Sequence, residues 1–220
     1  MIQLFIDTAT SRLIVGIYKD NKELYLENVE AHNDLSSKVL PTIKRICDEL
    51  EMKINDVDEI YVVNGPGSFT GIRVGITIAK TLAWSLNKKI YTVSELQLQA
   101  SGVKTKYIVP MIDARRGYVY AGVYNKNLKS TIKDQYIKFE ELNDLLKEYD
   151  KNDLTLVSYN KLDNVSLPEL NIEKLLEKGK FKEVNPHNVN PNYLKKTEAE
   201  EKLNDKNNKW SWQTILIFHY

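Results

Sequence analysis

The sequence is poor in the residues that build covalent or metal-bound frameworks. Its 220 residues include one cysteine, Cys47, and three histidines, His32, His187 and His219, which lie far apart in the chain. A single cysteine allows no internal disulfide, which is typical of a reducing compartment. Scattered histidines, without an H-x-x-x-H pair, predict no metal site. Because Cys47 falls on the apolar face of a predicted helix, we expect a buried packing thiol and not a nucleophile.

The sequence also lacks an excess of one charge and lacks long apolar runs. Lysine and arginine number 31 and aspartate and glutamate 30, so the formal net charge is +1 and no global field attracts nucleic acid or an anionic membrane. No apolar run approaches the ~20 residues of a membrane span. Met1 leads directly into the apolar IQLFID, without the basic stretch and cleavage site of a signal peptide. We therefore expect a cytoplasmic protein that does not bind membranes.

Hydrophobic periodicity predicts the same order of elements twice. In the first half we expect strands at 2–7, 12–19 and 22–30, a helix at about 34–50, a strand at 58–63, a helix ending near 86, a strand at 89–93 and a short helix at 94–102. In the second half we expect strands at 106–113, 117–124 and 130–139, a helix at 140–149, a strand at 154–159 and a weak helix at 167–178. The repeated β-β-β-α-β-α order predicts two similar α/β lobes, the second reduced. The predicted boundaries are 1–102 and 103–194, with a tail of uncertain structure at 195–220.

The stretch NGPGSFTGIRVG, residues 64–75, holds four of the nine glycines. It lacks the lysine of a Walker phosphate loop. The spacing of Gly65, Gly67 and Gly71 is one residue too long for a dinucleotide-binding fingerprint. A loop between a strand and a helix still suits an anion, so phosphate binding stays open as an alternative.

Helix packing explains the same glycines differently. Gly67, Gly71 and Gly75 are four residues apart, and Ala79 and Ala83 continue the step, which leaves a helix face without bulky side chains. Glycine in a helix costs about 1 kcal/mol relative to alanine, a cost that is tolerated where another backbone comes close. The apolar arc of this helix spans about 200°, wider than the ~100° that one sheet requires. We therefore expect a second neighbour, either the helix at 34–50 or another chain.

Trp84 and two aspartates stand out as candidate functional residues. Trp84 falls on the polar face of the same helix, beside Arg73 and Lys80. An exposed tryptophan next to cations is a common interface anchor. The alternative is that the protein's own short helix at 94–101 covers Trp84. Asp7 and Asp113 each end the first strand of one half. Two carboxylates at matching strand ends, facing one cleft, are placed as catalytic carboxylates often are. The alternative for both is that they cap a turn. No G-x-S-x-G elbow is present.

Five segments resemble one family. They are IDTAT at 6–10, HNDLSSKVLP at 32–41, NGPGSFTGIRVG at 64–75, MIDARRGYVYAGVY at 111–124 and NPNYL at 190–194. Together they are similar to the TsaB family, formerly YeaZ, of bacterial proteins for the synthesis of threonylcarbamoyladenosine in tRNA. The last 25 or so residues lie outside the resemblance.

The resemblance implies the two-lobed fold of the actin, Hsp70 and sugar-kinase ATPases, a duplicated RNase H-like α/β fold. In that superfamily a hairpin after the first strand of each lobe holds nucleotide phosphates. Here the hairpins match 7–11 and 113–117, which implies a vestigial cleft with Asp7, Thr8, Asp113 and Arg115. The glycine-rich adenosine stretch has no match, since after Gly122 only one further glycine follows. The resemblance therefore implies a non-catalytic paralogue that needs no cofactor or metal.

The implied partner is a TsaD homologue, the enzyme that carries out the carbamoyl transfer to the adenosine next to the anticodon. The family forms a heterodimer with TsaD, the ATPase TsaE joins the pair, and tRNA is expected only within the complex, with a homodimer possible when the chain is alone. The residues expected at the helical interface are Leu35, Val39, Gly71, Arg73, Gly75, Ala79 and Trp84. The alternative is a small ATP-dependent kinase or hydrolase that uses Asp7 and Asp113. An older family label, glycoprotease, has the least support because no protease constellation is present.

Overall fold

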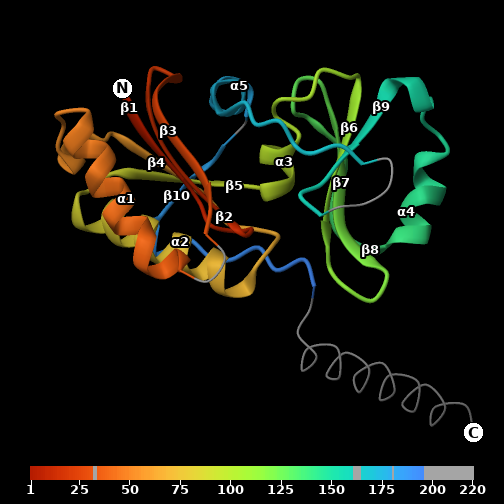
Figure 1. Ribbon diagram of the computed structural model, residues 1–220, viewed down its shortest axis with the longest axis horizontal. Coiled ribbons are helices and arrows are strands. Elements are labelled where there is room, and N and C mark those ends of the chain that lie inside the picture. Colours follow the sequence, from red (N-terminus) through yellow and green to blue (C-terminus); the bar gives the residue numbers. More distant parts are fainter. Residues whose placement is uncertain (32–33, 161–164, 180, 196–220) are drawn as a thin grey trace, which may run out of the picture.

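The computed structural model describes residues 1–31, 34–160, 165–179 and 181–195, and Figure 1 shows two lobes side by side. The tail predicted at 195–220 lies outside these residues except for Lys195, as do His32 and His219. In the first lobe the elements are β1 (Ile2–Asp7), β2 (Arg12–Lys19), β3 (Lys22–Glu30), α1 (Leu35–Glu49), η1 (Ile54–Asp56), β4 (Glu59–Val63), α2 (Phe69–Ser85), β5 (Lys89–Val93) and α3 (Glu95–Gln99). The second half contains β6 (Tyr107–Asp113), β7 (Tyr118–Asn125), β8 (Ser130–Lys138), α4 (Phe139–Leu146), η2 (Lys151–Asp153), β9 (Leu154–Val157), α5 (Ile172–Lys178), β10 (Glu183–Val184) and η3 (Pro186–Asn188).

Each lobe is built on one mixed sheet. The first sheet has six strands in the order β10-β5-β4-β1-β2-β3, and the second has four in the order β8-β7-β6-β9. In both sheets the first strand of the lobe pairs antiparallel with the next strand and parallel with a later one: β1 with β2 and β4, and β6 with β7 and β9. The matching topology confirms the predicted two-lobed α/β fold, with a second lobe reduced to a four-stranded sheet.

The helices cover the sheets as their apolar patterns require. The helices α1 and α2 lie together on one face of the first sheet, and α4 covers the outer face of the second (Figure 1). The apolar residues of α1 recur at helical spacing, and five of them are buried: Leu35, Val39, Ile43, Ile46 and Cys47. The burial of Cys47 confirms the predicted packing thiol. Between the lobes, α3 contacts β6 and β7, so the core of the first lobe continues into the second.

The predicted C-terminal boundary of the second lobe, residue 194, is corrected by the structure. The buried residues of α5 belong to the core of the first lobe, and β10 pairs antiparallel with β5 at the edge of the first sheet. The chain thus returns to the first lobe after β9. The link between the lobes near residue 102 is hydrogen-bonded to the segment before α5. The Gly102 N–H donates to the Glu169 carbonyl at 2.9 Å, and the Asn171 N–H donates to Ser101 Oγ at 2.8 Å.

Candidate functional site

The glycines of the loop before α2 and of its first turns face the hairpin between β1 and β2. A Cβ added at Gly67 would meet the Ala9 carbonyl oxygen, and one added at Gly71 would meet the Thr8 carbonyl oxygen, both closer than 3.0 Å. At Gly75 it would meet the Thr8 hydroxyl. Because backbone carbonyls come so close at Gly67 and Gly71, and the Thr8 hydroxyl at Gly75, these positions require glycine beside this hairpin. The glycines let α2 lie against the first hairpin.

Hydrogen bonds hold the same contact. The Thr8 hydroxyl donates to the Gly71 carbonyl at 2.7 Å, and the Ser68 N–H donates to the Ala9 carbonyl at 2.7 Å. The Ser68 side chain also accepts from the Gly71 N–H as the N-cap of α2. The loop that the sequence offered as a phosphate cradle is thus bound to the chain's own hairpin.

This packing corrects part of the predicted partner interface. Gly71, Gly75 and Ala79 are buried against the chain's own sheet and hairpin, so these three residues present no surface to another chain. Leu35 and Val39 are likewise buried on the inner face of α1. The predicted contact with the helix at 34–50 is present, since α1 packs against α2. Sequence periodicity did not identify the first hairpin as the backbone that approaches the glycines, because a helical pattern does not say which element lies opposite it.

The outer side of the α1–α2 pair carries an exposed apolar groove of about 480 Å³. Leu40 of α1 and Phe69 of α2 are each 51% exposed, and Val74 and Ile78 are half-buried beside them. We call these four residues with Arg73 the α1–α2 groove. Of its members only Arg73 was among the predicted interface residues. The wide apolar arc of α2 was the sequence signal for the others.

The segment 185–194 runs along α2 as a strap, from His187 beside Trp84 to Tyr193 beside Phe69. The Asn192 N–H donates to the Asn64 carbonyl at 2.7 Å. The Tyr193 ring stacks on Phe69 with centroids 5.0 Å apart, and the Arg73 guanidinium lies 3.8 Å from the centre of the Phe69 ring and donates to the Tyr193 hydroxyl at 2.9 Å. The strap therefore fixes Phe69 and Arg73 at one end of the α1–α2 groove.

A cleft of about 760 Å³ separates the lobes. Asp113 and Arg115 line it, together with residues from the first hairpin, the glycine loop, α3 and the chain after β9. Asp7 and Thr8, predicted for the same cleft, are fully buried and are not part of its lining. Of the four predicted cleft residues, Asp113 and Arg115 therefore line the cleft, and Asp7 and Thr8 do not.

Both aspartates cap the turn that follows their strand. Asp7 Oδ1 accepts from the Ala9 N–H at 2.7 Å, and Asp113 Oδ1 accepts from the Arg115 N–H at 2.8 Å. This is the turn-capping role that the sequence left open. The second turn is the more strained, since Arg115 and Arg116 both have positive φ values, 66° and 55°.

Asp7 also faces a buried glutamate that the sequence did not single out. Glu95, at the start of α3, is fully buried, and its Oε1 accepts from Gln99 Nε2 at 2.8 Å. Asp7 Oδ2 and Glu95 Oε2 have no hydrogen-bond partner within the described part of the chain. Burial raises the pKa of Asp7 to about 6, and burial together with the Asp7 charge raises the pKa of Glu95 well above its ordinary value. Both carboxyls therefore keep their protons to a higher pH than exposed carboxyls do.

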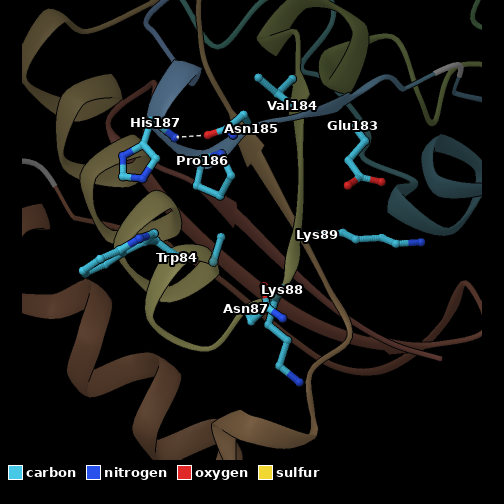
Figure 2. A pocket seen from close by; sticks show the side chains of 10 residues that line it. Trp84, Asn87, Lys88, Lys89, Glu183, Val184, Asn185, Pro186 and His187 are labelled. Atoms are coloured by element: carbon cyan, nitrogen blue, oxygen red, sulfur yellow. Dashed lines mark hydrogen bonds between the residues drawn. The ribbon is translucent and has the colours of Figure 1, made fainter.

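Trp84 lies at a second hollow, of about 510 Å³, at the C-terminal end of α2 (Figure 2). Its side chain is 65% exposed, so α3 does not cover it. The walls come from the end of α2, the start of β5 and residues 183–187. The His187 ring meets the indole edge to face, with centroids 6.0 Å apart. Trp84 therefore lies outside the α1–α2 groove.

Two further expectations concern metal and membrane. Among residues 1–31, 34–160, 165–179 and 181–195, no three histidine, cysteine or acidic side chains are grouped so that they could hold a metal ion. In the same ranges no helix has the length and apolar character needed to cross a bilayer.

Comparison with known proteins supplies the family. The family model described as TsaD: tRNA N6-adenosine threonylcarbamoyltransferase matches residues 29–190. A relative from Bacillus subtilis (strain 168), named tRNA threonylcarbamoyladenosine biosynthesis protein TsaB, is 31% identical over 223 residues, 92% of this chain and 97% of the relative. The chain belongs to the TsaB family. The Escherichia coli (strain K12) protein of the same name is 33% identical over 133 residues, 56% of this chain and 55% of that protein.

Solved structures of the family share the fold. A Pseudomonas aeruginosa protein described as similar to peptidase YEAZ superposes with a TM-score of 0.74 at 21% identity, over 88% of this chain and 99% of that one. The structure named YeaZ from Pseudomonas aeruginosa gives 0.71 at 22% identity, over 88% of this chain and 100% of that one. At this identity the likeness establishes the two-lobed fold of this TsaB-family chain and nothing further.

Proposed function

We propose that this TsaB-family chain is a non-catalytic subunit that binds and activates a TsaD homologue during formation of threonylcarbamoyladenosine next to the tRNA anticodon. The observation that carries the proposal is the α1–α2 groove. Leu40 and Phe69 expose apolar side chains in one groove between the packed helices α1 and α2, and aromatic and arginine side chains such as Phe69 and Arg73 are enriched at protein interfaces. A helical partner surface fits such a groove.

The remaining partners follow from the same assignment. We expect TsaE to join the pair, tRNA to be bound within the complex, and the α1–α2 groove to pair with a second copy of the chain when no TsaD homologue is present. The cytoplasm is the expected compartment. The chain needs no cofactor for this role.

The test is affinity for the TsaD homologue from the same cell, measured by titration calorimetry with the full chain. Leu40→Asp places a charge in the groove without removing a core contact, since Leu40 is half exposed. Loss of an interface anchor costs about 2 kcal/mol or more, which is roughly 30-fold in the dissociation constant. The matched control is Leu167→Asp, because Leu167 is 69% exposed and does not line the groove. Equal affinity for both variants would refute the assignment.

The alternative is a small ATP-dependent kinase or hydrolase that works in the cleft between the lobes. Asp113 and Arg115 line that cleft, which favours this alternative, but Asp7 is buried beneath it and faces Glu95. The enzyme hypothesis predicts micromolar binding of ATP and magnesium by the isolated chain and a turnover that Asp113→Ala abolishes. The subunit hypothesis predicts neither.

A further inference from the structure

The hollow at the end of α2 has the parts of a site that the proposed function does not use. Trp84 forms its aromatic wall with 65% of its side chain exposed. The His187 ring packs against the indole, and Lys80 Nζ donates to the His187 carbonyl at 3.4 Å. The indole is thus positioned by the segment that follows β10 while most of its surface stays accessible (Figure 2).

The other walls of this hollow are polar and mainly cationic. Lys88 and Lys89 line it at the start of β5, against one acidic residue, Glu183. Lys89 is exposed, whereas Lys88 is half-buried and its Nζ also donates to the Asn55 carbonyl at 2.8 Å; Figure 2 shows the Lys88 and Lys89 side chains at the edge of the hollow. Asn87 and Asn185 add amide groups, and Asn185 Oδ1 already accepts from the His187 N–H at 2.9 Å, which leaves its amide nitrogen to donate. The hollow therefore combines an aromatic face, cations and amides.

This combination differs from that of the α1–α2 groove. A protein anchor site is apolar at its centre, as the α1–α2 groove is, whereas lysine is depleted from such centres. Proteins that bind single-stranded RNA place bases on exposed aromatic rings, recognise base edges with amides and neutralise phosphates with lysine or arginine. A hollow of about 510 Å³ is also within the range that holds ligand-sized groups.

We propose that this hollow binds single-stranded RNA. One base stacks on the Trp84 indole, the Asn87 amide contacts the edge of that base, and the adjoining phosphates lie against Lys88 and Lys89. The formal net charge of the chain is only +1, so binding depends on this local group and is weak and sensitive to salt.

The hollow and the α1–α2 groove share no lining residue, so both surfaces can be occupied at once. Binding of RNA by the isolated chain does not require a TsaD homologue. Only the identity of the natural RNA as a tRNA with an unpaired loop rests on the proposed function.

The experiment measures fluorescence anisotropy of a fluorescein-labelled oligoadenylate with the full chain, at salt from about 50 to 200 mM. Trp84→Ala is expected to weaken binding roughly 5- to 100-fold, the effect of losing one base–aromatic stack, and Trp84→Phe to restore most of it. Changing Lys88 and Lys89 to glutamine together is expected to lower the slope of log affinity against log salt by about 1.4. The matched control changes Lys126 and Lys129, exposed on the turn between β7 and β8, to glutamine and should leave the slope unchanged.

Several results would overturn the proposal. These are no binding at the lowest salt, equal affinity for the wild type and Trp84→Ala, or equal slopes for the two lysine double variants. Melting of Trp84→Ala is measured in parallel and should match the wild type, because the residue is exposed. If Trp84→Ala weakens binding of the TsaD homologue but not of RNA, Trp84 is a protein anchor and the proposal is wrong. Failure here leaves the Leu40→Asp test of the α1–α2 groove unaffected.

Discussion

Thr8 and Gly75 allow a double-mutant test of how α2 is held against the first hairpin. A Cβ added at Gly75 would come closer than 3.0 Å to the Thr8 hydroxyl oxygen, while its next neighbours, Thr8 Cβ and Val62 Cγ2, would be at 3.7 and 3.8 Å. The hydroxyl is therefore the whole obstacle to alanine at this position. Removing it with Thr8→Ala should make Gly75→Ala tolerable.

The expected free energies follow from these contacts. Gly75→Ala alone gains up to about 1 kcal/mol in helix propensity but loses about 1–3 kcal/mol to overpacking, so we expect net destabilisation. Thr8→Ala loses a buried hydrogen bond to the Gly71 carbonyl, worth about 1 kcal/mol, and a buried methyl group, worth about as much. In the Thr8→Ala background only the propensity gain remains, so Gly75→Ala should stabilise the chain. The coupling energy is then about 1–3 kcal/mol.

Urea denaturation of the four chains measures this coupling, with thermal melting as a second readout. Gly71→Ala supplies the control, because its added Cβ would meet the Thr8 carbonyl, a backbone atom that Thr8→Ala leaves in place. We expect Gly71→Ala to destabilise both backgrounds equally. If Gly75→Ala is equally destabilising with and without the Thr8 hydroxyl, the glycine face is not held by this hairpin. If Gly75→Ala lowers the affinity for the partner without lowering stability, the glycine face contacts the partner.

Two further predictions concern the buried carboxyl of Asp7 and the half-buried carboxyl of Asp134. Burial raises the Asp7 pKa from 3.8 to about 6. Between these two pH values the folded chain keeps a proton that the unfolded chain releases. The protonated carboxyl therefore contributes roughly 3 kcal/mol of stability below pH 4, and this contribution is lost as pH rises through 6. Asp7→Asn should reduce that slope in urea titrations at pH 4 to 8 and stabilise the chain at pH 8, and the slope that remains comes from Glu95, whose pKa burial also raises. Asp113→Asn, the same change in the exposed second hairpin, should leave the slope intact. The Asp134 carboxylate of β8 accepts hydrogen bonds from the Tyr124 hydroxyl at 2.5 Å and from the Ser94 hydroxyl of the first lobe. Asp134→Asn leaves one of these donors unpaired, so it should lower the free energy of unfolding by about 1–3 kcal/mol. An unchanged urea midpoint would contradict this.

The strands and long helices were predictable because each buries a regular face. The predicted strand at 89–93 coincides with β5, and the helix predicted at 34–50 differs from α1 by one residue at each end. In contrast, β10 has two residues, too few for any period, and its pairing with β5 depends on the path of the chain after α5. The strap was recognisable only as a family motif, since its contacts join residues far apart in sequence.

The candidate site was less predictable for a related reason. An acidic residue in the first turn of a helix, as Glu95 is in α3, is a common surface feature, because it complements the helix dipole. Its unusual role arises from burial opposite Asp7, which no local pattern reveals. Leu40 and Phe69 were missed because a helical pattern separates apolar from polar faces but does not say which apolar residues the rest of the chain leaves uncovered.

The helix α2 shows why its glycines and its exposed residues occur together. Its inner line, Gly71 and Gly75, has no side chains, so the helix axis lies close to the first hairpin. This leaves apolar side chains such as Val74 on the flank next to α1, where they line the groove, and it leaves Trp84 on the flank beside the strap. Arg73 lies between the two, because it borders both the groove and the strap. A bulkier inner line would move the helix outward and shift both flanks relative to α1 and the strap. The glycines therefore bear on partner binding by setting where α2 lies, without contacting the partner themselves.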